Sequence, residues 1–199
     1  MKAPGYVILC LLWLFAAAAG AWGLLRYENT PSRAGETPST WPQDSQITPQ
    51  PGHSTLIMFA HPHCPCSSAS VGELNRLLTR CENPTAVHIL FIRPKDVAES
   101  WTETTLRKSA EAIPGAEVQL DPLGAEARRF GAESSGYVVL YNSEGHLLFS
   151  GGITAGRGHA GDNAGENLVV AGVNGEKFFL KHTPVFGCSL LDNCTNSTP

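Results

Sequence analysis

The sequence of 199 residues carries 14 lysines and arginines against 18 aspartates and glutamates, a net charge of −4 at pH 7. Charged residues make up 16% and apolar residues 42% of the chain, which excludes a disordered polypeptide and is typical of one ordinary folded domain. The isoelectric point is near 5.9 and the basic residues are not clustered, so we set nucleic-acid binding aside.

The first segment with a clear pattern runs from Tyr6 to Leu25 without a charged residue, between Lys2 and Arg26. At about 1.5 Å per residue, a helix of this length spans a bilayer. A cleaved signal peptide is the alternative, because small residues lie at 17–21, but its apolar region usually has only about 7–15 residues. We predict residues 1–26 as a single-pass anchor in the inner membrane, with the remaining chain in the periplasm.

Residues 27–53 are rich in proline, serine, threonine and glutamine, and such a composition buries too little apolar area to fold alone. We expect a tether, with Trp41 and Ile47 pinning its end onto the domain that follows. The folded domain is predicted at 54–175, and a tail that contains cysteines follows at 176–199.

Strand and helix patterns then alternate along the domain. Apolar runs predict buried strands at 54–60 and 87–92, and helical spacing predicts a helix from Ser67 to before Asn83-Pro84. The capping box Ser100-x-x-Glu103 predicts a helix to about Ala112. A strand at 117–120 is followed by a helix that runs to about Phe130, with Asp121 as its N-cap and Pro122 in its first position. A hairpin with strands at 137–141 and 146–151 and a helix at 163–171 complete the pattern. The fold class is therefore α/β, with a mixed central sheet flanked by helices.

This order of elements resembles the thioredoxin-like fold with the extra strand–helix insertion of membrane-tethered proteins of the TlpA/ResA type. Three segments also resemble RedB-type thioredoxin-like proteins: Phe59–Ser70 (FAHPHCPCSSAS), Gly151–Gly165 and Thr183–Leu190. The resemblance implies a tethered protein that exchanges electrons with extracytoplasmic protein thiols and disulfides near the membrane. No organic cofactor is required for that chemistry.

Cys64-Pro65-Cys66 falls between the first buried strand and the start of its helix. Unpaired N–H groups and the helix dipole favour negative charge there and lower a thiol pKa. We therefore predict Cys64 as the attacking thiolate and Cys66 as the resolving thiol, with His63 and His61 promoting the thiolate or moving its proton. The leading hypothesis is a thiol-disulfide oxidoreductase.

The chain departs from the thioredoxin pattern in two places. One residue instead of two separates the cysteines, so a Cys64–Cys66 disulfide closes only with distortion and is expected to be a more oxidising couple than that of a thioredoxin. Where thioredoxins place a cis-proline opposite the reactive cysteine, this chain has Ser134-Ser135-Gly136, so its partner contacts there are expected to differ.

Metal binding is the alternative function. His61, His63, Cys64 and Cys66 place four soft or borderline ligands within six residues, a set that suits copper or zinc, and His159 is a distant fifth candidate. A metal chaperone on a thioredoxin-like fold would use them. A non-catalytic binding module is a third hypothesis, under which the thiols are unreactive.

The glycine-rich loop at 153–161 follows the second strand of the hairpin, and we expect it to bring Arg157 and His159 towards Cys64. A mobile polar surface loop is the alternative.

The remaining cysteines have separate expectations. Cys81 lies about fifteen residues along the same helix as Cys66, too far to pair with it, and is predicted to be inert. Cys188 and Cys194 predict a local structural disulfide in the tail. Alternatively, Cys188 folds back as a second redox centre that exchanges with Cys64.

Overall fold

The computed structural model describes residues 3–95, 97–176 and 181–190. Two compact units divide between Thr30 and Pro31. The first unit consists essentially of one helix, α1, at Ala3–Glu28. Its span Gly5–Glu28, with a mean hydropathy of 2.2, is long and apolar enough to cross a membrane, which fits both the predicted anchor and a signal sequence.

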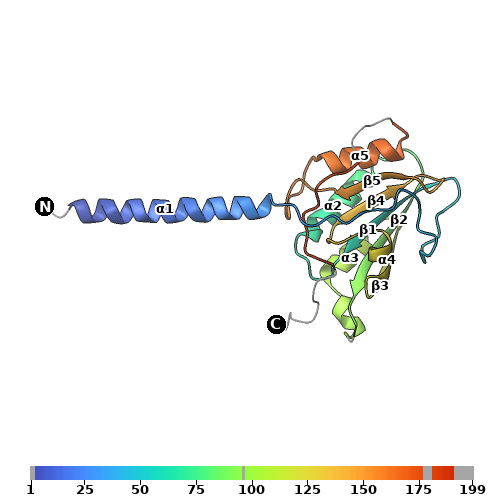
Figure 1. Ribbon diagram of the computed structural model, residues 1–199, viewed down its shortest axis with the longest axis horizontal. Coiled ribbons are helices and arrows are strands. Elements are labelled where there is room, and N and C mark those ends of the chain that lie inside the picture. Colours follow the sequence, from blue (N-terminus) through green and yellow to red (C-terminus); the bar gives the residue numbers. More distant parts are fainter. Residues whose placement is uncertain (1–2, 96, 177–180, 191–199) are drawn as a thin grey trace. The chain divides into compact units, whose positions relative to one another are not determined.

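The second unit is built on a mixed sheet of five strands in the order β3-β2-β1-β4-β5, shown in Figure 1. The strands are β1 (Ser54–Ala60), β2 (Thr85–Arg93), β3 (Ala116–Pro122), β4 (Tyr137–Tyr141) and β5 (Leu147–Gly152). β1 pairs in parallel with β2, and β2 with β3, whereas β4 runs antiparallel to both β1 and β5. Together with its helices, this topology is the thioredoxin-like fold, which confirms the predicted fold class.

Three helices cover one face of the sheet: α2 (Ser67–Leu78), α3 (Thr105–Glu111) and α5 (Ala164–Val173). Their apolar stripes pack on alternate residues of the central strands, because successive strand side chains point to opposite faces. The core of this face includes Met58, Leu74, Leu77, Ile89, Leu106, Val138 and Val169. α2 also lies against α5, so the helix that follows the Cys-Pro-Cys segment is held on two sides.

The other face of the sheet is covered by the short helix α4 (Ala125–Arg129) and by two segments without regular structure. The tail contributes the buried Val185 and Leu190, and the proline-rich segment contributes Ile47 and Trp41. The Trp41 ring lies edge-on to Phe130, with 5.0 Å between ring centroids.

The proline-rich segment belongs to the same compact unit as the domain from Pro31 onward. Trp41 and Ile47 do pin it, as predicted. The backbone of the segment also forms hydrogen bonds with the hairpin. Trp41 N–H donates to the Gly145 carbonyl at 2.8 Å, and Leu147 N–H donates to the Ser39 carbonyl at 2.9 Å. Composition missed this because the segment is ordered by contacts with the hairpin rather than by a core of its own.

Two helix starts differ from the sequence-based expectations. Ser100 and Glu103 do not open a long helix; they belong to a turn around the 3₁₀ helix η1 (Glu99–Thr102), and α3 starts later. Thr104 has an extended backbone, and its hydroxyl accepts the Arg107 N–H at 3.3 Å, so it is the better N-cap.

Asp121 lies within strand β3, which ends at Pro122, instead of standing next to a helix start. Its carboxylate accepts the N–H groups of Glu126 and Ala127, both at 2.9 Å, across the turn at 122–124. Gly124, with a positive φ of 65°, is the residue that precedes α4. Asp121 thus caps the helix from a distance, and the helix is shorter than expected.

Candidate functional site

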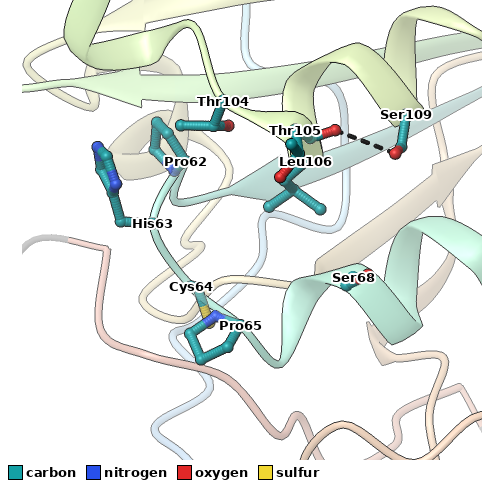
Figure 2. Close-up of a pocket in the computed structure, with 9 residues that line it drawn as sticks. All are labelled: Pro62, His63, Cys64, Pro65, Ser68, Thr104, Thr105, Leu106 and Ser109. Atoms are coloured by element: carbon teal, nitrogen blue, oxygen red, sulfur yellow. Dashed lines mark hydrogen bonds between the residues drawn. The ribbon is translucent and has the colours of Figure 1, made fainter.

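The Cys-Pro-Cys segment connects the end of β1 to the start of α2, as predicted (Figure 2). Cys66 is the N-cap residue of α2, and Cys64 lies two residues earlier in the turn. The Cys64 side chain is buried, with 2% exposure, whereas Cys66 is half-buried and Pro65 is exposed. Cys64 N–H donates to the His61 carbonyl at 3.0 Å, and Ser67 N–H donates to the Cys64 carbonyl at 3.2 Å, which fixes the turn.

Cys188 comes from the tail to lie directly against Cys64. The Cys188 N–H donates to the Cys64 sulfur at 3.4 Å, between residues that are 124 positions apart in the chain. The Cys188 thiol also donates to the same sulfur. Cys188 is itself exposed and free of any disulfide, so the two sulfurs form a thiol pair with one buried and one accessible member.

These contacts lower the pKa of Cys64 to about 4. The largest cause is the hydrogen bond from the Cys188 thiol, followed among the favourable contacts by hydrogen bonds from the Ser67 hydroxyl and from backbone N–H groups. Burial opposes them, because it disfavours the charged form, but does not outweigh them. Cys64 is therefore a thiolate at neutral pH. The same hydrogen bond raises the pKa of Cys188, which keeps its proton.

The hydroxyl groups of Ser135 and Ser67 form a hydrogen-bonded chain beside Cys64. His61 N–H donates to the Ser135 hydroxyl oxygen at 2.7 Å, and the hydroxyls of Ser135 and Ser67 are 2.6 Å apart. The Ser67 hydroxyl also lowers the pKa of Cys64 through a hydrogen bond, so the two serines and Cys64 form one hydrogen-bonded chain. Both serines are buried, so their hydroxyl groups act on the sulfur as fixed dipoles.

Ser135 and Gly136 lie beside β1 because the backbone there is closely packed. Gly136 N–H donates to the Phe59 carbonyl at 2.7 Å. Its φ is 85°, and a Cβ at this position would lie 2.7 Å from the Ser70 hydroxyl. Only glycine meets both demands, so Gly136 supports the site through the backbone and offers no chemical group.

The two histidines of the motif behave differently. His61 is half-buried near Cys64, and burial lowers its pKa while the Cys64 charge opposes that effect. His63 is exposed, with its Nε2 atom 2.9 Å from the Trp101 carbonyl oxygen and its ring centroid 4.6 Å from that of Trp101. In Figure 2 the His63 ring points away from the Cys64 sulfur. The geometry therefore places His61 near the thiolate, whereas His63 fastens the loop to η1.

A pocket of about 510 Å³ opens between the Cys64 loop and the start of α3 (Figure 2). Pro62, Pro65 and Leu106 give it apolar walls, and Thr104, Thr105 and Ser109 give it hydroxyl groups. Cys64 is one of the lining residues. An uncharged groove of this kind beside a reactive sulfur suits a polypeptide segment better than a charged small molecule.

Arg157 approaches the site as predicted, but it reaches the tail and Cys66. Its guanidinium donates to the Gly187 carbonyl at 2.8 Å and to the Ser32 hydroxyl at 3.0 Å. Its charge lowers the pKa of Cys66, although burial and the nearby Cys64 leave that pKa raised overall. His159 is exposed in the same loop, where its N–H donates to the Gly156 carbonyl at 3.3 Å.

The metal hypothesis finds no support in this geometry. Within residues 3–95, 97–176 and 181–190, no three histidine, cysteine or acidic side chains come together in a way that could hold a metal ion. The candidate ligands of the motif are divided between the two sides of the loop: His63 faces Trp101, whereas Cys64 faces the tail.

The other cysteines fall into two groups. The Cys81 thiol donates to the Leu77 carbonyl at 3.4 Å, and burial raises its pKa, which are properties of an unreactive thiol. Cys194 lies outside the described residues, so its pairing with Cys188 remains a prediction. Of the two expectations for Cys188, its fold-back towards Cys64 is the arrangement that the structure contains.

Three residues of the site were not predicted from the sequence: Ser67, Trp101 and Ser32. Ser67 had a local signal, since it lies three positions after Cys64 in the first turn of the helix. The other two reach the site through the tertiary fold, from η1 and from the proline-rich segment. No local pattern marks either one.

No protein-family model and no curated protein matches this sequence. Among solved structures, hypothetical protein SMc02350 from Sinorhizobium meliloti 1021 is 19% identical with a TM-score of 0.55, covering 83% of this chain and 96% of that one. An uncharacterised conserved protein from Geobacillus kaustophilus is 15% identical with a TM-score of 0.56, covering 84% and 94%. A secreted disulfide oxidoreductase of Mycobacterium tuberculosis, homologous to Escherichia coli DsbE, is 14% identical with a TM-score of 0.45, covering 63% and 83%. The first two likenesses support the fold alone, and the third is too distant in structure to bear on function.

Proposed function

We propose that this protein is an extracytoplasmic, membrane-tethered thiol-disulfide oxidoreductase whose attacking group is the Cys64 thiolate. The observation that carries the proposal is the convergence of donors on one buried sulfur: the Cys188 N–H and thiol and the Ser67 hydroxyl all point to Cys64. A structural cysteine in a core needs no such donors, whereas a nucleophilic one does. The resemblance to RedB-type proteins along three segments fits the same proposal.

The chemistry follows from the thiolate. Cys64 attacks one sulfur of a partner's disulfide, forming a mixed disulfide with Cys64 and releasing the partner's other sulfur as a thiolate. A second thiol of this chain then attacks the Cys64 sulfur and releases the partner's remaining thiolate. The chain becomes a disulfide and the partner is reduced by two electrons; the reverse sequence oxidises the partner. These steps use only sulfur and protons, so the chain's own residues are sufficient.

The pocket beside Cys64 supports a protein partner. Its walls mix apolar and hydroxyl groups along the Cys64 turn and the start of α3, which suits an extended peptide carrying a cysteine. The helix α1 supplies the tether in this proposal. The partners would then be proteins that reach the same membrane surface, since tethering raises their effective concentration.

The experiment is the reduction of glutathione disulfide by the reduced full chain in detergent micelles. We expect Cys64→Ser to abolish the reaction and Cys81→Ser, the matched control in an unreactive position, to leave it unchanged. Mass spectrometry after acid quenching should find glutathione on Cys64 as the first adduct. Undiminished reduction by Cys64→Ser would overturn the proposal.

A further inference from the structure

We propose that Cys188, and not Cys66, is the thiol that pairs with Cys64, so that the working disulfide joins the Cys-Pro-Cys turn to the tail. The inference rests on the proposed function and adds a catalytic residue to it. It starts from the contact between the two residues: the Cys188 backbone N–H is 3.4 Å from the Cys64 sulfur, and its thiol donates to that sulfur. The two residues that would be joined are therefore already in contact.

The tail is held in place on both sides of Cys188. Ser189 pairs with Ser134 in an antiparallel bridge, Ser135 N–H donates to the Cys188 carbonyl at 2.8 Å, and Leu190 N–H donates to the Glu133 carbonyl at 2.8 Å. The tail thus lies along residues 133–135 through one isolated bridge and its flanking backbone hydrogen bonds, and the buried Leu190 side chain anchors it. A thiol fixed in this way has a high effective concentration at Cys64.

A clamp holds the residue before Cys188. The Gly187 carbonyl accepts the Arg157 guanidinium at 2.8 Å and the Ser32 hydroxyl at 2.6 Å, and the Gly187 N–H donates to the Ser32 oxygen at 3.0 Å. A Cβ on Gly187 would lie 1.8 Å from the Ser135 carbonyl oxygen, so only glycine permits this close approach. The proline-rich segment, the glycine-rich loop and the serine turn therefore combine to place Cys188.

Cys66 is less suited to the pairing. Only Pro65 separates it from Cys64, so a disulfide between them closes a small ring that includes a fixed proline, and such a ring deviates from relaxed disulfide geometry. Cys66 is also the N-cap of α2, and the helix behind it fixes its backbone. Cys188, by contrast, approaches Cys64 from a distant part of the chain and lies outside any helix, so its pairing closes no small ring.

The step balances in atoms and electrons. With a partner protein disulfide as the oxidant, Cys64 and the partner form a mixed disulfide; the Cys188 thiol, losing its proton to solvent, attacks the Cys64 sulfur. The Cys64–Cys188 bond forms and the bond to the partner breaks, releasing a partner thiolate.

The experiment equilibrates the full chain in detergent with a glutathione redox buffer, quenches with acid, alkylates and maps the tryptic peptides. Trypsin separates residues 34–76, which contain Cys64 and Cys66, from 182–199, which contain Cys188 and Cys194. We expect these two peptides to be cross-linked, with the cross-link retained in Cys66→Ser and lost in Cys188→Ser. A disulfide closed within 34–76 and retained in Cys188→Ser would overturn the inference while leaving the proposed function standing. A disulfide closed within 182–199 as the dominant product would also overturn it.

A variant outside the two cysteines tests the placement. Gly187→Ala should lower the equilibrium constant for the cross-link at least tenfold, since the Cβ displaces the tail from Ser135. Gly72→Ala is the matched control, because a Cβ at Gly72 meets no atom within 4 Å. Circular dichroism verifies that both variants fold. An unchanged cross-link in Gly187→Ala would overturn the inference, and the absence of any disulfide at Cys64 in the wild type would overturn the proposed function with it.

Discussion

Replacing Cys188 by alanine removes the largest cause of the acidity of Cys64. The backbone N–H of residue 188 remains, but the thiol donor is lost. A hydrogen bond to a charged group contributes about 1.5–3 kcal/mol, and about 1.4 kcal/mol corresponds to one pH unit in a titration midpoint. We therefore expect the pKa of Cys64 to rise from about 4 to roughly 5–6 in Cys188→Ala.

The assay is the rate of iodoacetamide alkylation of Cys64 between about pH 3 and about pH 8, which brackets both midpoints. A Cys66→Ser background leaves Cys64 as the one thiol of peptide 34–76. The titration midpoints are compared rather than the limiting rates, because the limiting alkylation rate also changes when the Cys188 side chain beside the sulfur is shortened. Cys188→Ser retains a hydroxyl donor and should shift the midpoint less than Cys188→Ala. Equal midpoints in the wild type and Cys188→Ala would show that the Cys188 thiol does not lower the pKa of Cys64.

Three further predictions follow from other parts of the molecule. Trp41→Ala should lower the free energy of unfolding by about 3 kcal/mol in urea titrations, since the ring packs on Phe130 and Tyr141; a loss of less than about 1 kcal/mol would contradict that packing. The melting temperature of the reduced wild type should rise relative to that of Cys64→Ser as the pH increases from about 4, and the difference should level off near the ordinary thiol pKa of 9.0. The reason is that folding lowers the pKa of Cys64, so the folded state is favoured once this thiol is ionised. A difference in melting temperature that is the same at every pH would contradict the prediction. Arg157→Met should raise the pKa of Cys66 further, measured by alkylation of Cys66 in a Cys64→Ser background, while Arg76→Met on the surface of α2 should leave it unchanged.

The alternation of strand and helix patterns was sufficient to predict the fold class. The apolar run of β1 and the helical spacing of α2 are local signals that the tertiary structure reinforces, so the position of Cys64 between them could be predicted as well. The first residues of α3 and α4 could not be predicted from local patterns. At α3 the capping residue is Thr104 instead of Ser100, and at α4 Asp121 caps the helix across an intervening turn, so both starts depend on the backbone of the preceding turn.

The environment of Cys64 was only partly accessible to sequence reasoning. A lowered thiol pKa followed from the helix start, but its largest cause is Cys188, which reaches the site through backbone pairing with residues 133–135. That pairing joins an irregular tail to a turn, and neither has a periodic pattern. Gly187 was the one local hint, because a glycine directly before a cysteine permits close approach of the backbone.

Whether Cys64 is redox-active is tested by a redox titration of the full chain in detergent micelles, with the oxidation state of Cys64 measured by alkylation at each potential. We expect one reversible two-electron transition in which Cys64 is lost as a free thiol, and the same curve when the titration is run from the reduced and from the oxidised side. A Cys64 thiol that remains alkylatable across the whole range of glutathione potentials would contradict the account.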